Sequence, residues 1–335
     1  TIWLEQLPTA NLDESLPMIM KDIELSAIGI NLDAGNAAMT QLAKFASFAK
    51  TQEKNLSNMR LFVNLDPFAP DAAVSLLDEG LDYAAKARSD DLPFQLFRAN
   101  GWEWHNRGMT TVQELAYVMA SLTEIMREGM ARGLDLGHLA SNLSASIALP
   151  TNLFDGIAKC RALRRCWGGI VGALGLDPDA YRLFLQGAVS VRMFSLIDVE
   201  MNMLRITTAL LGGAIGGADQ LSSHPHDCLE GGSAESRRLA RMQHYLLIEE
   251  SGLSQSLDPS GGAGFIEARS NQLADSAWQL FQKIEGDGGA KAVYSSGQFN
   301  SLALKAAAKR HSRFAAGDLN LIGVNLQPDG RSMST

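Results

Sequence analysis

Short apolar runs alternate with amphipathic helical patterns along the chain, and this alternation restricts the fold more than any other feature of the sequence. Each apolar run resembles a β-strand, and each is followed by a segment whose apolar residues recur at helical spacing. Parallel strands joined by helices produce this order, because a parallel connection needs a crossover. The sequence therefore predicts an α/β fold. The seven predicted strands are Ile2–Leu4, Ala27–Leu32, Leu61–Leu65, Phe94–Ala99, Leu143–Ala148, Arg182–Leu185 and, with a weaker pattern, Asp219–Ser222.

The segments between these strands carry one apolar face each. They are predicted as helices at Ala37–Ala49, Ala72–Ala85, Thr111–Arg132, Leu153–Leu174, Asp198–Leu211 and Ser236–Glu250. In the third of them, the predicted buried face consists of Leu115, Val118, Met119, Leu122, Ile125 and Met126. No linker rich in Pro, Gly and Ser divides the chain, so a single domain is predicted. An eight-fold barrel lacking one unit and a doubly wound sheet both fit this pattern.

Composition excludes several classes of partner. The net charge is -8, and Lys and Arg are scattered, which argues against a nucleic-acid surface. The three cysteines include no Cys-x-x-Cys pair, so neither a disulfide framework nor a thiolate zinc site is predicted, and a reducing cytoplasm fits. The longest apolar run, Ala209–Ala218, is interrupted by glycines and is too short to cross a bilayer, and no signal peptide is recognised. We therefore expect a cytoplasmic protein without a membrane partner.

An ordered series of motifs lies in the last third of the chain. It begins with Asp-Val-Glu-Met-Asn-Met-Leu-Arg-Ile-Thr-Thr at 198–208, and Leu-Leu-Ile-Glu-Glu-Ser-Gly follows at 246–252. Asp-Pro-Ser-Gly-Gly-Ala-Gly-Phe-Ile-Glu-Ala at 258–268, Glu-Gly-Asp-Gly-Gly at 285–289 and Ile-Gly-Val-Asn at 322–325 complete the series. In this order the motifs resemble the substrate-binding barrel of methylmalonyl-CoA mutase and its relatives. The resemblance is clear from about residue 111 to 325.

The resemblance implies a fold and its boundaries. It implies a (β/α)8 TIM-type barrel over residues 1–325, followed by a short tail at 326–335 and no cobalamin-binding domain. On this interpretation Thr1–Glu5 corresponds to the second strand of the barrel, and the first strand is expected upstream of the sequence given. The active site of such a barrel lies at the carboxyl ends of its strands and in the loops that follow them.

The segment after the strand Phe94–Ala99 departs from the family at a decisive place. It is expected to be a loop and reads Gly-Trp-Glu-Trp-His-Asn-Arg-Gly at 101–108, whereas catalytic members resemble Gly-Tyr-His-Met-Gln-Glu-Ala-Gly. The resemblance implies that the family histidine donates a hydrogen bond to the substrate thioester carbonyl. Glu103 takes that position here, and an ionised carboxylate can only accept. His105, two residues further on, is a substitute only if the register shifts.

A second departure follows the strand Arg182–Leu185. Catalytic members have a Gln-Thr-Ser-Gly-Trp-Ser pattern, and this chain has Ala-Val-Ser-Val-Arg-Met at 188–193, in which only Ser190 remains in place. Asp198, Asn202 and Arg205 do match the family, and a structural role in capping and ion pairing is predicted for them.

These departures leave the catalytic residue unknown. Glu103 and His105 are the candidates for catalysis. The candidates for substrate binding are polar or aromatic residues at the predicted carboxyl ends of strands, namely Asn100, Trp102, Gln186, Ser190 and His224.

Cofactor and metal motifs are the third point of difference. The mutases of this family need adenosylcobalamin, and the resemblance implies that they bind it through an Asp-x-His-x-x-Gly motif in a separate domain. That motif does not occur here, so the chain alone is predicted to bind no cofactor and to receive adenosylcobalamin through a partner or a domain outside the sequence given. His-Pro-His-Asp at 224–227 has no third ligand at a defined spacing, so no metal site is predicted.

Three functions fit this pattern. The first is a catalytically degenerate small subunit that forms a heterodimer with a large mutase subunit and stabilises it. The second is the substrate subunit of an acyl-CoA mutase, an isomerase of the methylmalonyl-CoA to succinyl-CoA type, with cobalamin on a separate subunit and Glu103 or His105 at the thioester. The third is an acyl-CoA binding module. A filled barrel and an exposed apolar patch favour the first, and an open tunnel lined by His105, Gln186 and His224 favours the second.

Overall fold

The strands of the chain follow one another in the sheet in the same order as in the sequence. The computed structural model describes residues 2–3, 11–52, 59–86 and 94–328. Its seven-stranded sheet has the order β1-β2-β3-β4-β5-β6-β7, and the pairs β1–β2, β2–β3, β3–β4 and β6–β7 are parallel. The strands are β1 Ile2–Trp3, β2 Gly29–Asn31, β3 Arg60–Leu65, β4 Phe94–Asn100, β5 Leu143–Leu149, β6 Phe184–Val189 and β7 Gln220–Ser222.

This strand order distinguishes the two folds that periodicity left open. A doubly wound sheet reverses its order at a switch point, whereas a TIM-type barrel keeps sequence neighbours adjacent throughout. The order found here has no reversal. The predicted α/β class with the strand order of a TIM-type barrel is therefore confirmed. All seven predicted strands occur, although Leu4 lies outside the described residues.

One strand prediction was wrong in its position. The sequence predicted a strand at Arg182–Leu185 and a loop from Gln186 onward, but β6 runs from Phe184 to Val189. Gly187, Ala188 and Val189 are small or β-branched, so they fit the buried interior of a parallel sheet and extend the strand. Gln186 therefore lies inside the strand, paired in register with Gln220 of β7.

Helices lie between successive strands, and further helices come after the last strand, β7. They are α1 Leu12–Ile19, α2 Ala38–Gln52, α3 Leu76–Lys86, α4 Gly101–Arg107, α5 Thr111–Ala131, α6 Leu136–Ser141, α7 Leu153–Ala173, α8 Met201–Ile215, α9 Ala234–Tyr245, α10 Gly264–Gly286, α11 Gly289–Ser295 and α12 Gln298–Ala315. A π-helical turn, Leu246–Glu250, continues α9. The apolar face predicted for Thr111–Arg132 is confirmed, because its six residues are all buried in α5. None of the described helices is both long and apolar enough to cross a membrane.

The described residues form two compact units. The first contains those up to Asn100 together with Ser121–Ala145 and Val171–Leu183. The second contains Gly101–Ala120, Ser146–Ile170 and the described residues from Phe184 onward. In the first unit, α1 packs on α2, and α2 packs on β3 through a core that includes Leu16, Leu42 and Phe45.

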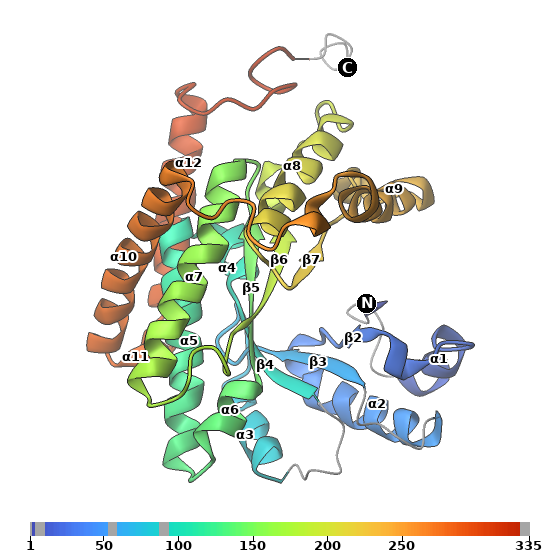
Figure 1. The fold of residues 1–335 in the computed structure, drawn as a ribbon, viewed down its shortest axis with the longest axis vertical. Helices are drawn as coiled ribbons and strands as arrows, with labels where there is room; N and C mark the ends of the chain where they lie inside the picture. The colour runs from blue at the N-terminus through green and yellow to red at the C-terminus, as the bar shows by residue number, and fades with distance from the viewer. Residues whose placement is uncertain (1, 4–10, 53–58, 87–93, 329–335) are drawn as a thin grey trace. The chain divides into compact units, whose positions relative to one another are not determined.

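In the second unit, α10 lies beside α7 (Figure 1). Arg161 on α7 forms ion pairs with Asp258 and Glu267, and Arg269 on α10 pairs with Asp155 on α7. Asp258 belongs to the Asp-Pro-Ser-Gly-Gly turn. That motif therefore holds two helices together.

An aromatic cluster fixes α4 in the same unit. Trp104, Tyr117 and Phe299 are fully or almost fully buried, and their ring centroids lie 5.1 to 5.8 Å apart. They join α4 to α5 and α12. Gly108, just after α4, has φ +134°, and a Cβ at this position would lie 2.7 Å from Ala307 Cβ and would also meet the carbonyl oxygen of Ala303. Only glycine lets the end of α4 approach α12 this closely.

Gly108→Ala is expected to destabilise the chain more than the same change at a glycine with open surroundings. Gly133 is the matched control, because it has φ +77° and nothing within 4 Å of a built Cβ. Gly133→Ala should cost about 1 to 2 kcal/mol from backbone strain, and Gly108→Ala about 1 to 3 kcal/mol more from overpacking. Urea unfolding of both variants measures the difference. Equal losses would show that the contact of α4 with α12 carries no constraint.

Candidate functional site

The segment between β4 and α5 is a helix rather than the predicted loop. α4 begins directly at the end of β4, and its buried face consists of Gly101, Trp104 and His105 and is continued by Gly108, directly after the helix. These positions have the i, i+3, i+4, i+7 spacing of one helix face. The loop prediction was wrong because burial of Trp104 draws the segment into helical geometry. Trp102 and Glu103 consequently lie on the more exposed side, and His105 points inward.

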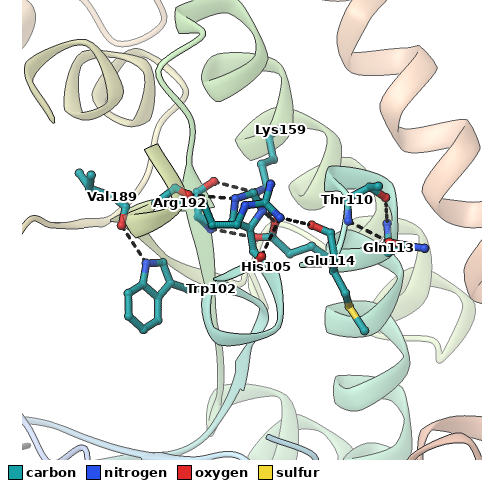
Figure 2. Close-up of polar contacts among 11 residues, drawn as sticks. Trp102, His105, Thr110, Gln113, Glu114, Lys159, Val189 and Arg192 are labelled. Atoms are coloured by element: carbon teal, nitrogen blue, oxygen red, sulfur yellow. Dashed lines mark hydrogen bonds and ion pairs between the residues drawn. The ribbon is translucent and has the colours of Figure 1, made fainter. Parts of the chain in front are cut away.

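His105 is held by hydrogen bonds at both ring nitrogens, and Figure 2 shows the one to Glu114. Nδ1 lies 2.8 Å from Glu114 Oε2, and Nε2 lies 3.0 Å from Ser190 Oγ. The residue is only 4% exposed. The structure therefore brings together two predicted site residues, His105 and Ser190, which are far apart in the sequence.

Glu114 on α5 is the centre of this network, which Figure 2 shows. Lys159 Nζ on α7 donates to Glu114 Oε2 at 2.5 Å and to the Ala148 carbonyl at 2.7 Å. The amide of Ala148 in β5 donates to Glu114 Oε1 at 2.7 Å. Both charged side chains are buried completely. Four elements therefore meet at one carboxylate, since α5, α7, β5 and α4 each supply a donor or the acceptor.

Arg192 holds the other end of α4. Its Nη1 donates to the carbonyls of His105 at 2.8 Å and Met109 at 3.0 Å. The His105 carbonyl also accepts from the Gly108 amide at 2.9 Å, so Arg192 adds a second donor at the carboxyl end of the helix, where the helix dipole favours a positive charge. Burial lowers the pKa of Arg192 to about 10, and the nearby Arg310 acts in the same direction. The guanidinium is still charged at neutral pH, so it fixes the backbone on which His105 stands.

The protonation states of the network follow from its charges. Burial opposes ionisation of Glu114, but Lys159 and His105 outweigh it and hold the pKa of this carboxyl below its usual value. Burial lowers the pKa of His105 to about 4, although Glu114 opposes this shift. At neutral pH His105 is therefore neutral. Because Glu114 can only accept, Nδ1 carries the hydrogen and Nε2 accepts from the Ser190 hydroxyl.

Trp102 and His224 form a second contact at the carboxyl ends of strands. Trp102 Nε1 donates to the Val189 carbonyl at 2.9 Å (Figure 2), and the Trp102 ring stacks on His224 with 5.6 Å between centroids. Both side chains are half-buried. Burial lowers the pKa of His224, so its ring is neutral at pH 7. The two predicted residues thus form a neutral, partly exposed aromatic surface.

The remaining candidates are Gln186, Glu103 and Asn100. Gln186 is buried in β6, and Glu103 is half-buried on α4. Asn100 belongs to the first unit, where its backbone amide donates to Asp66 at 2.6 Å. Their predicted roles in catalysis or substrate binding stay predictions.

The carboxyl ends of β2, β3 and β4 in the first unit carry a polar cluster of their own. Arg98 Nη2 donates to Asn31 Oδ1 at 3.1 Å, and Asn64 Nδ2 reaches the same oxygen at 3.4 Å. Arg98 is 2% exposed. Burial lowers its pKa to about 10, while the nearby carboxyl of Asp33 opposes this shift. Side chains of the chain itself therefore occupy the edge of the sheet where ligands of α/β proteins bind.

Asn202 and Arg205 have a structural role, but it consists of hydrogen bonds to backbone groups and to each other rather than the predicted capping and ion pairing, and the N-cap of α8 is Glu200. The Asn202 amide bonds both backbone groups of Ser195 and the carbonyl of His226, at 2.9 to 3.0 Å. Arg205 donates to Asn202 at 2.7 Å and to the Ile322 carbonyl at 2.5 Å. The motif at 198–208 therefore holds the distant Ile-Gly-Val-Asn motif in place.

Sequence reasoning missed Glu114, Lys159 and Arg192 as site residues. Glu114 lies next to the apolar stripe of α5, one turn before Val118, and Lys159 lies one turn before Leu163 on α7. A charged residue at the edge of a buried face is a signal for a buried pair, but each side chain can also reach solvent from such a position. Among the described residues, no group of three or more potential ligands is arranged to hold a metal ion.

Comparison with known proteins places these residues in context. Residues 11–332 match a family model described as methylmalonyl-CoA mutase. The chain is 30% identical over 331 residues to a probable methylmalonyl-CoA mutase small subunit of Mycobacterium tuberculosis, covering 94% of this chain and 52% of the relative. It is 26% identical over 324 residues to the methylmalonyl-CoA mutase small subunit of Porphyromonas gingivalis, covering 94% and 52%. It is 25% identical over 326 residues to the mitochondrial methylmalonyl-CoA mutase of Bos taurus, covering 93% and 43%. The chain spans about half the length of the curated relatives it matches.

Lys159→Met is expected to destabilise the chain by about 3 to 5 kcal/mol at neutral pH, because it leaves a buried carboxylate without its cation. The pKa of Glu114 then rises above its unfolded value, so protonation in acid relieves the loss. Urea unfolding at about pH 8 and about pH 5 should give the larger difference from the wild type at the higher pH. Adding Glu114→Gln should remove this pH dependence. A loss that is the same at both values would contradict an ionised Glu114.

His105→Gln is expected to flatten the acid side of the stability profile. A group whose folded pKa is depressed contributes stability above its unfolded pKa and loses it as the pH falls through the folded one. For His105 this window runs from 6.5 to about 4, with a slope of about 1.4 kcal/mol per pH unit. Free energies of unfolding across this range measure the slope. His311→Gln is the control, because His311 lies exposed on α12, and a variant H105Q as steep as H311Q would refute a buried neutral His105.

Proposed function

Because the chain belongs to the methylmalonyl-CoA mutase family, we propose that it is a catalytically degenerate small subunit that binds and stabilises a larger catalytic subunit. The names of the relatives in Mycobacterium tuberculosis and Porphyromonas gingivalis agree with this role, since both are called small subunits. The observation that carries the proposal is the state of His105, the side chain best suited to replace the missing donor at the thioester.

His105 has no free donor for a substrate. Its Nδ1 hydrogen bonds Glu114, and its Nε2 accepts from Ser190. A neutral imidazole with these partners has no N–H left to donate to a thioester carbonyl. Glu103, which occupies the position of the family histidine, is a carboxylate and accepts rather than donates when ionised. Neither candidate supplies the hydrogen bond that the family reaction needs.

Two further features support a subunit role. The carboxyl ends of β2, β3 and β4 are occupied by Asn31, Asn64 and Arg98, whose side chains bond one another. In the second unit, Leu204 on α8 and Tyr245 on α9 are each 58% exposed. Gln243 on α9 donates to Met203 and Thr207 on α8, so the two helices are in contact. Exposed apolar side chains on adjoining helices are typical of protein interfaces.

The residues of this chain do not fit adenosylcobalamin. None of its six histidines lies in the Asp-x-His-x-x-Gly context. His105 has both nitrogens occupied, and His244 Nε2 is bonded to Ser223 at 3.0 Å. The cofactor is therefore assigned to the partner in this proposal.

A second candidate function is that of a substrate barrel working with a separate cobalamin-binding subunit. The contact between Trp102 and His224 favours it, because a neutral and partly exposed aromatic pair at the carboxyl ends of strands suits an organic ligand. The same surface would serve an acyl-CoA binding module.

Mixing the purified chain with a large mutase subunit is expected to give a stable heterodimer and a higher melting temperature for the large subunit. With adenosylcobalamin and methylmalonyl-CoA, the chain alone should form no succinyl-CoA, and neither should the chain with a separate cobalamin-binding subunit. Size-exclusion chromatography, thermal unfolding and a succinyl-CoA assay provide the measurements.

Substitutions separate the candidates. Leu204→Asp should weaken the heterodimer, and Leu304→Asp is its control, because Leu304 is exposed on α12, away from α8 and α9 in sequence. Turnover without the large subunit that disappears in His105→Ala or Glu103→Ala would overturn the degenerate role and establish the second candidate.

A further inference from the structure

A line of hydrogen bonds runs from Ser190 through His105 to Glu114. The proposed subunit role assigns no function to this line. Ser190 Oγ lies 3.0 Å from His105 Nε2, and His105 Nδ1 lies 2.8 Å from Glu114 Oε2. Figure 2 shows the second of these bonds between α4 and α5. Both lengths are within the range in which a nucleophile, a base and an orienting carboxylate act together.

The direction of the bonds is fixed by the donors available. Glu114 is an acceptor only, so the imidazole hydrogen is on Nδ1. Nε2 then has a free lone pair, and the Ser190 hydroxyl donates to it. This is the polarity that transfers the serine proton to histidine when the oxygen attacks an electrophile.

Other residues hold each member of the line in place. Glu114 is fixed by the Lys159 ammonium at 2.5 Å and by the Ala148 amide at 2.7 Å. Arg192 binds the backbone carbonyl of His105 at 2.8 Å. Ser190 follows β6 directly, at the edge of the sheet where active sites of such barrels lie. His105 and Glu114 thus lie on helices, and Ser190 lies in the connection directly after a strand.

The chain also contains a simpler serine–histidine pair. Ser223 Oγ lies 3.0 Å from His244 Nε2. Within the described residues, no hydrogen bond joins His244 Nδ1 to a carboxylate. The two pairs differ in the orienting group, so Ser223 is an internal control for Ser190.

We propose that Ser190 is a nucleophile for acyl transfer from a short-chain acyl ester or thioester, with His105 as its base and Glu114 as the carboxylate that orients the base. Ser190 Oγ attacks the carbonyl carbon and forms a C–O bond, while its proton passes to His105 Nε2. The C–S or C–O bond of the leaving group breaks, and the leaving thiolate or alkoxide takes the proton from Nε2. Water then attacks the acyl-serine by the same route, which releases the carboxylic acid and restores Ser190.

Access to Ser190 depends on the neighbouring aromatic contact. Ser190 is 2% exposed, so a side chain must move before an acyl group reaches it. Trp102 donates to the carbonyl of Val189, the residue before Ser190, and is half-buried. We therefore assign the gating movement to Trp102. Burial also disfavours the imidazolium that forms during the attack, so the reaction is slow and covalent labelling is the more sensitive readout.

The experiment uses the full chain without partner or cofactor. The protein is incubated with p-nitrophenyl acetate, with acetyl-CoA and with a fluorophosphonate probe. Release of nitrophenolate or thiol is followed, and the modified residue is located by peptide mass spectrometry. None of the three probes takes part in the mutase reaction. A failure of the acyl-transfer proposal can therefore be distinguished from a failure of the proposed subunit role.

The wild type and Ser223→Ala are expected to be labelled at Ser190 and to release product at the same rate. Ser190→Ala should lose the label and fall to the uncatalysed rate, and His105→Gln should lower the rate about 100-fold. Trp102→Ala should accelerate labelling several-fold. Absence of label in both folded wild type and folded W102A would overturn the proposal, and so would wild-type release by S190A. Circular dichroism establishes that each variant is folded.

Discussion

The buried ion pair between Glu114 and Lys159 is the interaction on which the second compact unit depends. Both side chains are fully buried, and both also bond the backbone of Ala148 in β5. One carboxylate thereby sets the position of α5 relative to α7 and β5. It also fixes the ring of His105 on α4. Removing either charge would leave the other in an environment of low dielectric, where an unpaired ion is costly. The pair therefore specifies the arrangement of four elements at once.

Helix geometry decides what the family motif at 101–108 becomes in this chain. The family resemblance puts Glu103 where catalytic members have histidine, and it makes His105 a substitute only if the register shifts. In α4 the two residues lie on different sides, because Trp104 and Gly108 bury the face that contains His105. His105 therefore enters the network of Glu114, and Glu103 stays on the half-exposed side. The chemistry of the segment follows from which face is buried rather than from its register in a motif.

Apolar periodicity predicted the strands and six of the twelve described α-helices, because it is a local signal that buried strands and amphipathic helices both carry. The barrel-type order was implied by the family resemblance, since periodicity left a doubly wound sheet open. The stripe of α5 from Leu115 to Met126 is the clearest case. The site was predicted only in part. Glu114 and Lys159 are separated by 45 residues, and no periodic pattern relates two positions so far apart. The loop prediction at 101–108 and the position of Gln186 were wrong because tertiary burial extended regular structure over residues whose local signals were weak.

Stability alone does not explain why the chain buries the network of Lys159, Glu114 and His105. Buried ion pairs are often no more stabilising than apolar residues of the same volume, since desolvation offsets most of the attraction. Lys159, Glu114 and His105 could in that sense be replaced by a hydrocarbon core without loss of stability. What hydrocarbon cannot reproduce is a defined orientation of groups. The network fixes the tautomer of one imidazole and the direction of one serine hydroxyl. If Ser190 cannot be acylated, the fixed orientation of His105 and Ser190 serves only the packing of α4. If Ser190 can be acylated, the same orientation supports acyl transfer in a chain that lacks the proposed hydrogen-bond donor of the mutase reaction.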